Sequence, residues 1–74
     1  MMILETIGEN AGTVWRLLNA AEVPLTIPEL KQQAGLSDHD LYAAMGWLAR
    51  EGKIFFAEKD GSTWVSLFPV NVYF

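Results

Sequence analysis

Three residues, Gly35-Leu36-Ser37, separate two short amphipathic segments, and this spacing constrains the fold more than any other feature of the chain. Before the gap, Thr26 and Glu29 have the spacing of a capping box, which predicts a helix over residues 27–34. After the gap, the serine is a second N-cap, and the helix that it starts is expected over about residues 38–51. A three-residue connection with a glycine is typical of two helices that cross, with the leucine of the turn buried between them. The sequence therefore predicts a helix-turn-helix.

A β-hairpin is predicted directly after the second of these helices, over about residues 53–67. Asp60-Gly61 lies between two runs rich in apolar residues. A two-residue type I′ turn needs positive φ at both central positions, and Asp-Gly is one of the pairs that best allow this. With the turn centred there, the pairs predicted on the inward face are Phe56 with Val65 and Ile54 with Leu67. The residues predicted on the outward face, which is too apolar for water alone, are Phe55, Ala57 and Trp64.

A longer first helix is predicted over about residues 4–20. The apolar residues that recur with a helical period are Ile7, Ala11, Val14, Leu18 and Ala21, and those that widen this stripe are Ile3, Leu4 and Trp15. Gly8 and Gly12 leave two bare backbone positions on one side of the helix. Either another element of the same chain packs closely there, which is the interpretation we favour, or a second subunit does.

The remaining segments complete an α+β fold in a single domain of 74 residues. Leu25-Thr26 is extended and is expected to add a third short strand to the hairpin. The tail, residues 68–74, contains Pro69 and then alternates like one more strand. It is too apolar for a frayed end, so we expect it to dock on Phe55 and Trp64 of its own chain or across a dimer interface. The predicted architecture is three helices, a small antiparallel sheet and a strand-like tail.

This order of elements resembles the winged helix-turn-helix proteins, and more narrowly a group of short, functionally uncharacterised bacterial members. The segments that carry the resemblance are Ile7–Gly12 with Val14-Trp15, and Met45–Ile54. The likeness extends over nearly the whole chain, and the second segment is its most distinctive part. It implies the winged-helix fold. It implies no established activity, ligand or catalytic residue.

Composition favours a self-associating protein of the cytoplasm. Half of the residues are hydrophobic (51%) and three are tryptophan, which is more apolar surface than so small a domain can bury. We therefore expect a homodimer. The chain has no cysteine, its first residues lack the basic start of a signal peptide, and no apolar run approaches the length that spans a bilayer.

Charge argues against strong nucleic-acid binding. Five Lys and Arg face nine Asp and Glu, a net charge of −4, whereas phosphate contacts need a basic patch. Ala43 and Gly46, at the centre of the predicted recognition helix, offer no groups to base edges. Asp38 and Asp40 at its start would repel phosphate, although capping also explains them. The residues that remain as candidates for contact with duplex DNA are His39, Arg50, Lys53 and Lys59.

An alternative role is that of a protein-interaction module. The residues that could dock a protein are Tyr42, Gly46, Trp47, Phe55, Trp64, Val72, Tyr73 and Phe74. Catalysis is not expected, because Ser37 has no base placed to activate it and the chain has no Gly-rich phosphate loop. His39 shares no metal-ligand spacing with its acidic neighbours, so we expect no metal, cofactor or small-molecule ligand. The sequence thus leaves two functions open, a homodimeric regulator with weak contact to DNA and a protein-docking module.

Overall fold

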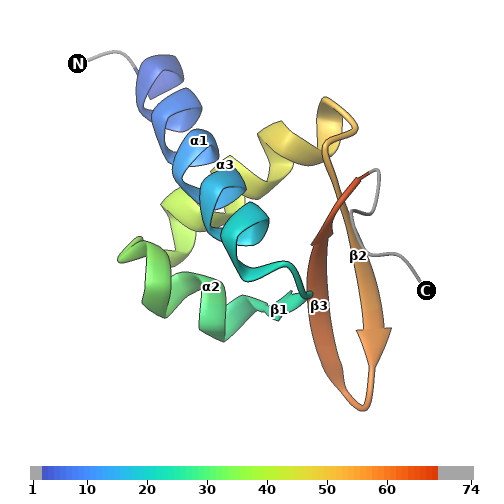
Figure 1. The fold of residues 1–74 in the computed structure, drawn as a ribbon. Coiled ribbons are helices and arrows are strands. Elements are labelled where there is room, and N and C mark those ends of the chain that lie inside the picture. Colours follow the sequence, from blue (N-terminus) through green and yellow to red (C-terminus); the bar gives the residue numbers. More distant parts are fainter. Residues whose placement is uncertain (1–2, 69–74) are drawn as a thin grey trace.

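The computed structural model describes residues 3–68 and shows three helices beside a twisted hairpin (Figure 1). The elements in chain order are α1 (Ile3–Ala21), β1 (Leu25–Thr26), α2 (Ile27–Ala34), α3 (Asp38–Arg50), β2 (Ile54–Lys59) and β3 (Ser62–Leu67). Helix α1 is one residue longer at each end than the prediction, and α3 ends one residue earlier. The α+β fold, with its helix-turn-helix and its wing, is confirmed.

The sheet is antiparallel with the strand order β1-β3-β2. Asp60 and Gly61 have φ values of 53° and 77°, so both central residues of the turn have the positive φ that a type I′ turn needs. The register pairs Phe56 with Val65 and Ile54 with Leu67, as predicted. On the other edge of β3, Leu25 of β1 pairs with Val65, which confirms the third short strand.

The helix ends form as their capping residues predict. The Thr26 hydroxyl accepts a hydrogen bond from the Glu29 N–H (3.3 Å), and a Glu29 carboxylate oxygen accepts one from the Thr26 N–H (2.8 Å), which completes the capping box of α2. Gly35 ends α2 in the left-handed conformation (φ 67°), with its N–H donating to the Lys31 carbonyl. The Ser37 hydroxyl accepts from the Asp40 N–H (3.2 Å) at the start of α3. The turn between α2 and α3 is therefore fixed from both sides.

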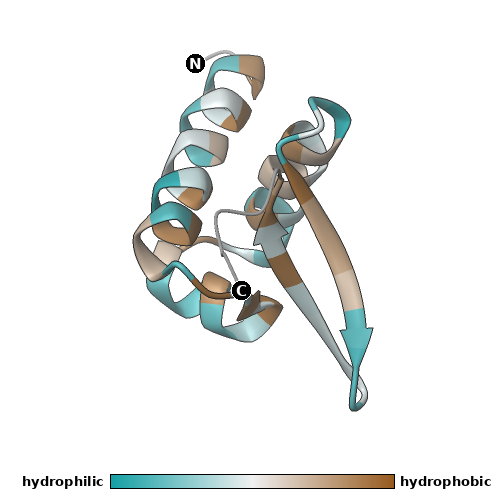
Figure 2. Ribbon diagram, turned by 45° about the vertical axis from the view of Figure 1, so that its right-hand side comes forward, coloured by the Kyte–Doolittle hydropathy of each residue, from teal (hydrophilic) through white to brown (hydrophobic). Residues whose placement is uncertain are grey.

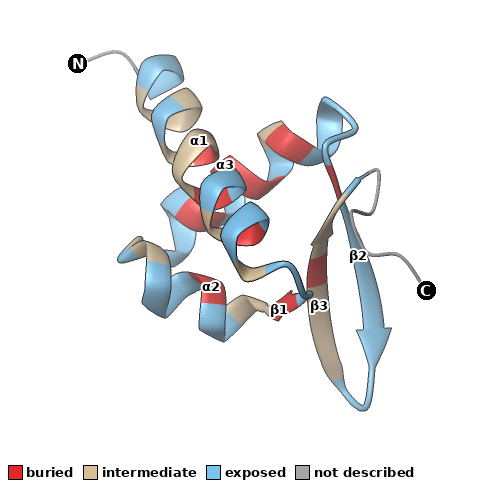
Figure 3. Ribbon diagram, viewed as in Figure 1, coloured by how far each residue is buried: buried red, intermediate tan, exposed pale blue. Residues whose placement is uncertain are grey.

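The core lies where the three helices meet the sheet (Figure 3). Its buried residues are Ala11, Val14, Leu18, Leu25, Leu30, Leu41, Ala44, Met45, Leu48, Ile54 and Val65. The four residues of α3 in this core, Leu41, Ala44, Met45 and Leu48, form one stripe along the helix, and Leu36 of the turn packs half-buried against the same cluster. Helices α1 and α3 together hold most of this core, so α3 is anchored along one side and exposed along the other.

Two expectations about apolar positions are wrong. Phe56 is on the predicted inward face but is 45% exposed, and the residues expected to widen the α1 stripe, Ile3, Leu4 and Trp15, are exposed as well. For Phe56, Ile3 and Leu4 the reason is reach, because the hairpin and the start of α1 extend beyond the helices that could cover them (Figures 1 and 3). Trp15 lies further along the helix, beside the buried Val14, at the edge of the buried stripe. Figure 2 shows that the part of the hairpin near the helices is apolar and that its tip is hydrophilic.

The favoured interpretation of the α1 glycines is also wrong for the described residues. A Cβ placed on Gly8 would meet nothing within 4 Å, and one on Gly12 would meet only the side chain of Arg16 on the same helix, at 3.4 Å. No other element of residues 3–68 therefore packs closely on these glycines. The contact with a second subunit stays a prediction.

The capping box of α2 makes a testable prediction about pH. The Thr26 N–H and hydroxyl both donate to the Glu29 carboxylate, and these bonds hold the pKa of Glu29 below its usual value of 4.5. A lowered folded-state pKa stabilises the fold above the unfolded-state pKa, and this contribution is lost as the pH falls through the folded-state pKa. We expect native protein to exceed Glu29→Gln in unfolding free energy at about pH 7. This excess should shrink as the pH falls below 4.5, so that it is smaller at about pH 3.

Urea denaturation at both pH values measures this difference. Glu9→Gln is the matched control, because it also removes an exposed α-helical carboxylate but one whose side chain caps no helix. The prediction would be contradicted if the difference in unfolding free energy between native protein and Glu29→Gln were the same at both pH values.

Candidate functional site

The exposed side of α3 has few groups that could read a base edge. Its outward positions include Tyr42, Gly46 and Arg50, and Ala43 is half-buried beside them. A Cβ at Gly46 would meet nothing within 4 Å. The glycine therefore lies in the open and not beneath the wing, and the centre of the helix presents a bare backbone surface with no donor or acceptor side chain.

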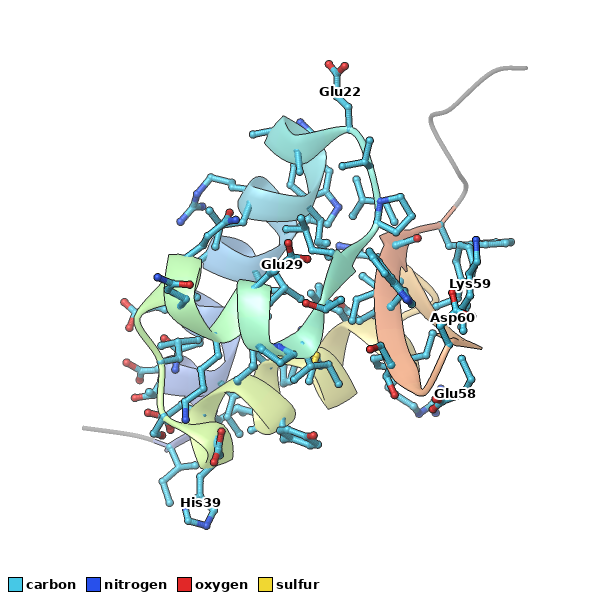
Figure 4. All side chains as sticks on the ribbon, turned by 90° about the horizontal axis from the view of Figure 1, so that it is seen from below. Glu22, Glu29, His39, Glu58, Lys59 and Asp60 are labelled. Atoms are coloured by element: carbon cyan, nitrogen blue, oxygen red, sulfur yellow. The ribbon has the colours of Figure 1, made fainter. Side chains whose placement is uncertain are left out.

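The four candidate DNA contacts do not gather in one place. His39 lies in the first turn of α3 and Arg50 is its last residue, about 16 Å apart along the axis at 1.5 Å per residue. Lys53 precedes β2 and Lys59 ends it, so the six residues of the strand separate them by roughly 20 Å. Figure 4 shows His39 projecting from the domain on the side away from the hairpin tip that carries Lys59. Only Arg50 and Lys53 are near neighbours.

Ion pairing divides these cations into two kinds. The Lys53 ammonium is 3.7 Å from a Glu51 carboxylate oxygen, and both side chains are about half exposed. Arg50 and Lys59 make no ion pair within residues 3–68. Near the start of α3, the Lys31 ammonium pairs with Asp38 at 3.0 Å, which offsets one of the two acids there. Arg50 is consequently the cation most available to an anionic partner at the end of α3.

The candidate protein-docking residues separate into a helical group and a hairpin group. On α3, Tyr42 is 57% exposed beside the open Gly46, whereas Trp47 is half-buried against the core. On the hairpin, Phe55 is exposed and Trp64 is half-buried. The other three candidates, Val72, Tyr73 and Phe74, lie outside the described residues.

A hollow beside the hairpin was not predicted from the sequence. It has a volume of about 1140 Å³ and lies between the end of α1, the segment that leads into β1, and the outward face of β2 and β3. Phe55 and Trp64 line one side of it, and Leu18 and Val23 line another. These segments are distant in the sequence, so no local pattern could reveal it, although the apolar outward face of the hairpin was a partial signal.

The described residues contain neither a cluster of metal-ligating side chains nor a helix that could span a membrane. No three of the His, Asp and Glu side chains in residues 3–68 lie close enough together to hold a metal ion. Within the same range, none of the helices combines the length and the hydropathy that crossing a bilayer requires.

A helix-turn-helix whose third helix is exposed on one side, followed by a wing that pairs with β1, defines a winged helix-turn-helix domain. Residues 2–67 match the family described as "Winged helix-turn-helix domain (DUF2582)", and the chain belongs to this family.

Two similar proteins come from different domains of life. The "Uncharacterized protein MJ1608" of Methanocaldococcus jannaschii is 42% identical over 60 residues, a match that covers 80% of this chain and 84% of that protein. The solution NMR structure of protein BT2368 from Bacteroides thetaiotaomicron has a TM-score of 0.78 and 38% identity, and the match covers 90% of this chain and 80% of that one. The resemblance to this family is confirmed, and its archaeal relative shows that it is not restricted to bacteria.

Proposed function

We propose that this chain is a non-enzymatic, homodimeric regulator of the cytoplasm that makes weak contact with duplex DNA through the end of α3 and the wing. The observation that carries the proposal is Arg50, an exposed guanidinium without an ion pair in residues 3–68 at the end of the recognition helix. In winged-helix proteins that bind DNA, this helix lies in the major groove and the wing contacts the flanking backbone. Lys53 and Lys59 extend the same contact along the hairpin.

The spread of these cations fits phosphate contact better than base reading. A helix and a wing that follow the DNA backbone need cations at separate points, and a separation of roughly 20 Å along β2 supplies them. The bare surface at Ala43 and Gly46 supplies no direct readout. Phosphate contacts position a protein on DNA but carry no sequence information. The proposed contact is therefore weak and has little preference for sequence.

An NMR titration with a generic duplex at low salt tests this proposal. Amide signals around Arg50, Lys53 and Lys59 should shift, and the shifts should fade as salt is added, because phosphate contacts release counterions. Signals at His39 should change less, since that side chain lies at the opposite end of α3. Excess duplex at about 50 mM salt without any shift would remove DNA from the proposal.

Dimerisation is proposed to use the exposed side of α1 that borders its buried stripe. Leu4, Gly8 and Trp15 lie on this side at helical spacing, with Leu4 58% and Trp15 38% exposed. The open glycines allow a second helix to approach closely. Such a contact would cover apolar surface that the fold leaves in water.

We expect light scattering at high micromolar protein to give twice the 8.3 kDa mass of the chain. Trp15→Glu should weaken the dimer at least about 30-fold, because a buried aromatic anchor typically contributes 2 kcal/mol or more. Trp64→Ala is the comparison variant, and it should leave the mass unchanged since Trp64 is on the hairpin. A monomer mass for native protein would end the proposal, and loss of the dimer only in Trp64→Ala would move the contact to the hairpin.

The second candidate function is that of a protein-docking module. The observation that favours it is the apolar outward face of the hairpin, where Phe55 is exposed beside a large hollow. Exposed aromatic side chains at a concave surface are typical of protein contacts. In this alternative, Tyr42 and the open backbone at Gly46 would contact protein in place of DNA. Shifts at the hairpin and around Tyr42 and Gly46 in the presence of a protein partner, with none caused by DNA, would favour it.

A further inference from the structure

The hollow beside the hairpin has the shape and chemistry of a site for an extended, uncharged peptide segment. Its long side is the outward face of the sheet, where Ala57 lies opposite Trp64 and Phe55 opposite Ser66. Its charged residues are Glu22, just after α1, Glu29, whose carboxylate accepts hydrogen bonds from Thr26, and Lys59 and Asp60, at the hairpin tip. Figure 4 shows Glu22 and the hairpin tip at separate edges of the molecule. Most of the other lining residues are aromatic or aliphatic, and Asn19 and Ser66 are polar.

Trp64 supplies a specific polar group in this site. Its indole Nε1 is buried and has no hydrogen-bond partner among the described residues. A tryptophan N–H only donates, and a buried one usually finds an acceptor. The occupant should therefore combine apolar side chains with an oxygen that can accept this hydrogen bond, which a peptide carbonyl provides.

The described part of the chain ends at the wall of the hollow. The Phe68 N–H donates to the Lys53 carbonyl at 2.8 Å, so the sheet pairing continues one residue beyond β3. The Phe68 ring meets Phe55, a lining residue, edge to face, with centroids 6.1 Å apart and an interplanar angle of 88°. Phe68, the last described residue, therefore lies next to the site.

The following six residues, 69–74, have the composition that the hollow requires. They are Pro-Val-Asn-Val-Tyr-Phe, none of which has a charged side chain, and Val70, Val72 and Phe74 alternate with Asn71 and Tyr73. Extended, six residues reach at most about 20 Å, which is the length of β2 at roughly 3.3 Å per residue. An uncharged segment also avoids placing an ionised group in an apolar site.

We propose that residues 69–74 occupy this hollow in their own chain, with one of their oxygens accepting the hydrogen bond from Trp64 Nε1. The same chain is favoured over a second copy because the segment is tethered at Phe68, and a short tether gives an effective concentration on the order of millimolar. A second copy would have to exceed that concentration in solution. The assignment depends neither on DNA binding nor on the α1 dimer. It makes the segment a competitor for any protein that would dock on Phe55 and Trp64.

NMR of the full chain tests the proposal. The Trp64 indole proton should show nuclear Overhauser contacts to side chains of residues 70–74, and it should exchange with solvent about tenfold more slowly than the indole proton of the exposed Trp15. In a sample mixed from two differently labelled populations, these contacts should appear within a chain and not between chains. Contacts between chains would overturn the proposal in favour of a second copy.

Matched variants separate docking of the segment from a change in the fold. Val72→Asp introduces a charge on the apolar side of the alternation, and it should speed Trp64 indole exchange to about the rate of Trp15. Asn71→Asp introduces the same residue on the other side and should leave exchange slow. Contacts between Leu25 and Val65 report that β1 and β3 stay paired in both. Absence of contacts to residues 70–74, or equal exchange at Trp64 and Trp15 in native protein, would overturn the proposal.

Discussion

Leu41→Ala is expected to lower the free energy of unfolding by about 3 kcal/mol, within a range of about 2–5 for leucine truncations in a core. Leu41 is fully buried in α3, among residues of α1 and the sheet. A cavity at this point removes contacts from several elements at once. A domain of 74 residues has roughly 4–11 kcal/mol of stability in total. Thermal unfolding followed by circular dichroism should therefore show a midpoint lowered by roughly 12–24 °C.

Leu4→Ala is the matched control, since it makes the same substitution on a helix where the side chain is 58% exposed. We expect its effect to stay within about 0.5 kcal/mol when measured at protein concentrations below dimer formation. The difference in lost unfolding free energy between Leu41→Ala and Leu4→Ala measures the contribution of burial, because both variants remove the same atoms. A loss below about 1 kcal/mol for Leu41→Ala would mean that the helices do not enclose this residue.

The local geometry of this fold was predictable because short-range chemistry determines it. The capping box at Thr26, the left-handed Gly35 and the Asp60-Gly61 turn each depend on residues within four positions of one another. Once the turn is placed, strand pairing follows by counting, which is why the Phe56–Val65 register was correct. Each of these features was visible in the sequence before any tertiary contact was known.

Burial was less predictable because it depends on how far each element reaches. Periodicity placed Phe56 on the inward face, but no helix extends far enough along β2 to cover it, and Ile54 is the one residue of that strand that is buried. Trp15 was expected to widen the α1 stripe for the same reason and is exposed. An alternating or helical pattern shows which side a residue is on. It does not show whether the opposite layer extends that far.

The candidate site was predictable in its composition and not in its shape. The sequence identified Arg50, Lys53 and the aromatic outward face of the hairpin as candidates. The predicted strand already implied the separation of roughly 20 Å between Lys53 and Lys59, but the sequence could not show a hollow between the end of α1 and the hairpin. The hollow depends on the packing of segments distant in the sequence. The unpartnered Trp64 Nε1 likewise becomes visible only in three dimensions.

Affinity for duplex DNA is expected to fall roughly 40-fold when the salt concentration rises from about 50 to about 200 mM. If Arg50, Lys53 and Lys59 each neutralise one phosphate, the logarithm of the binding constant falls against the logarithm of salt with a slope of about −2.7. A fourfold increase in salt then gives the stated loss. Fluorescence anisotropy of a labelled generic duplex across this range measures the slope directly.

Single charge removals show which cations make the contact. Arg50→Gln should reduce the slope by about 0.9, because this guanidinium has no ion pair in the described part of the chain. Lys53→Gln should reduce the slope by less. The Lys53 ammonium is 3.7 Å from a Glu51 carboxylate oxygen, so it must give up this ion pair to contact a phosphate. Arg16→Gln, on α1, is the control that changes net charge equally without touching α3 or the wing.

If Arg16→Gln reduced the slope as much as Arg50→Gln, the binding would follow net charge and no face of the protein would be engaged. If Arg50→Gln reduced the slope and Arg16→Gln did not, the end of α3 would be the contact. The chain would then bind DNA by the backbone-positioning part of winged-helix recognition, without the base reading for which Ala43 and Gly46 provide no groups. A regulator of this kind would need its sequence preference from a partner protein. That partner would compete with residues 69–74 for the apolar face of the hairpin at Phe55.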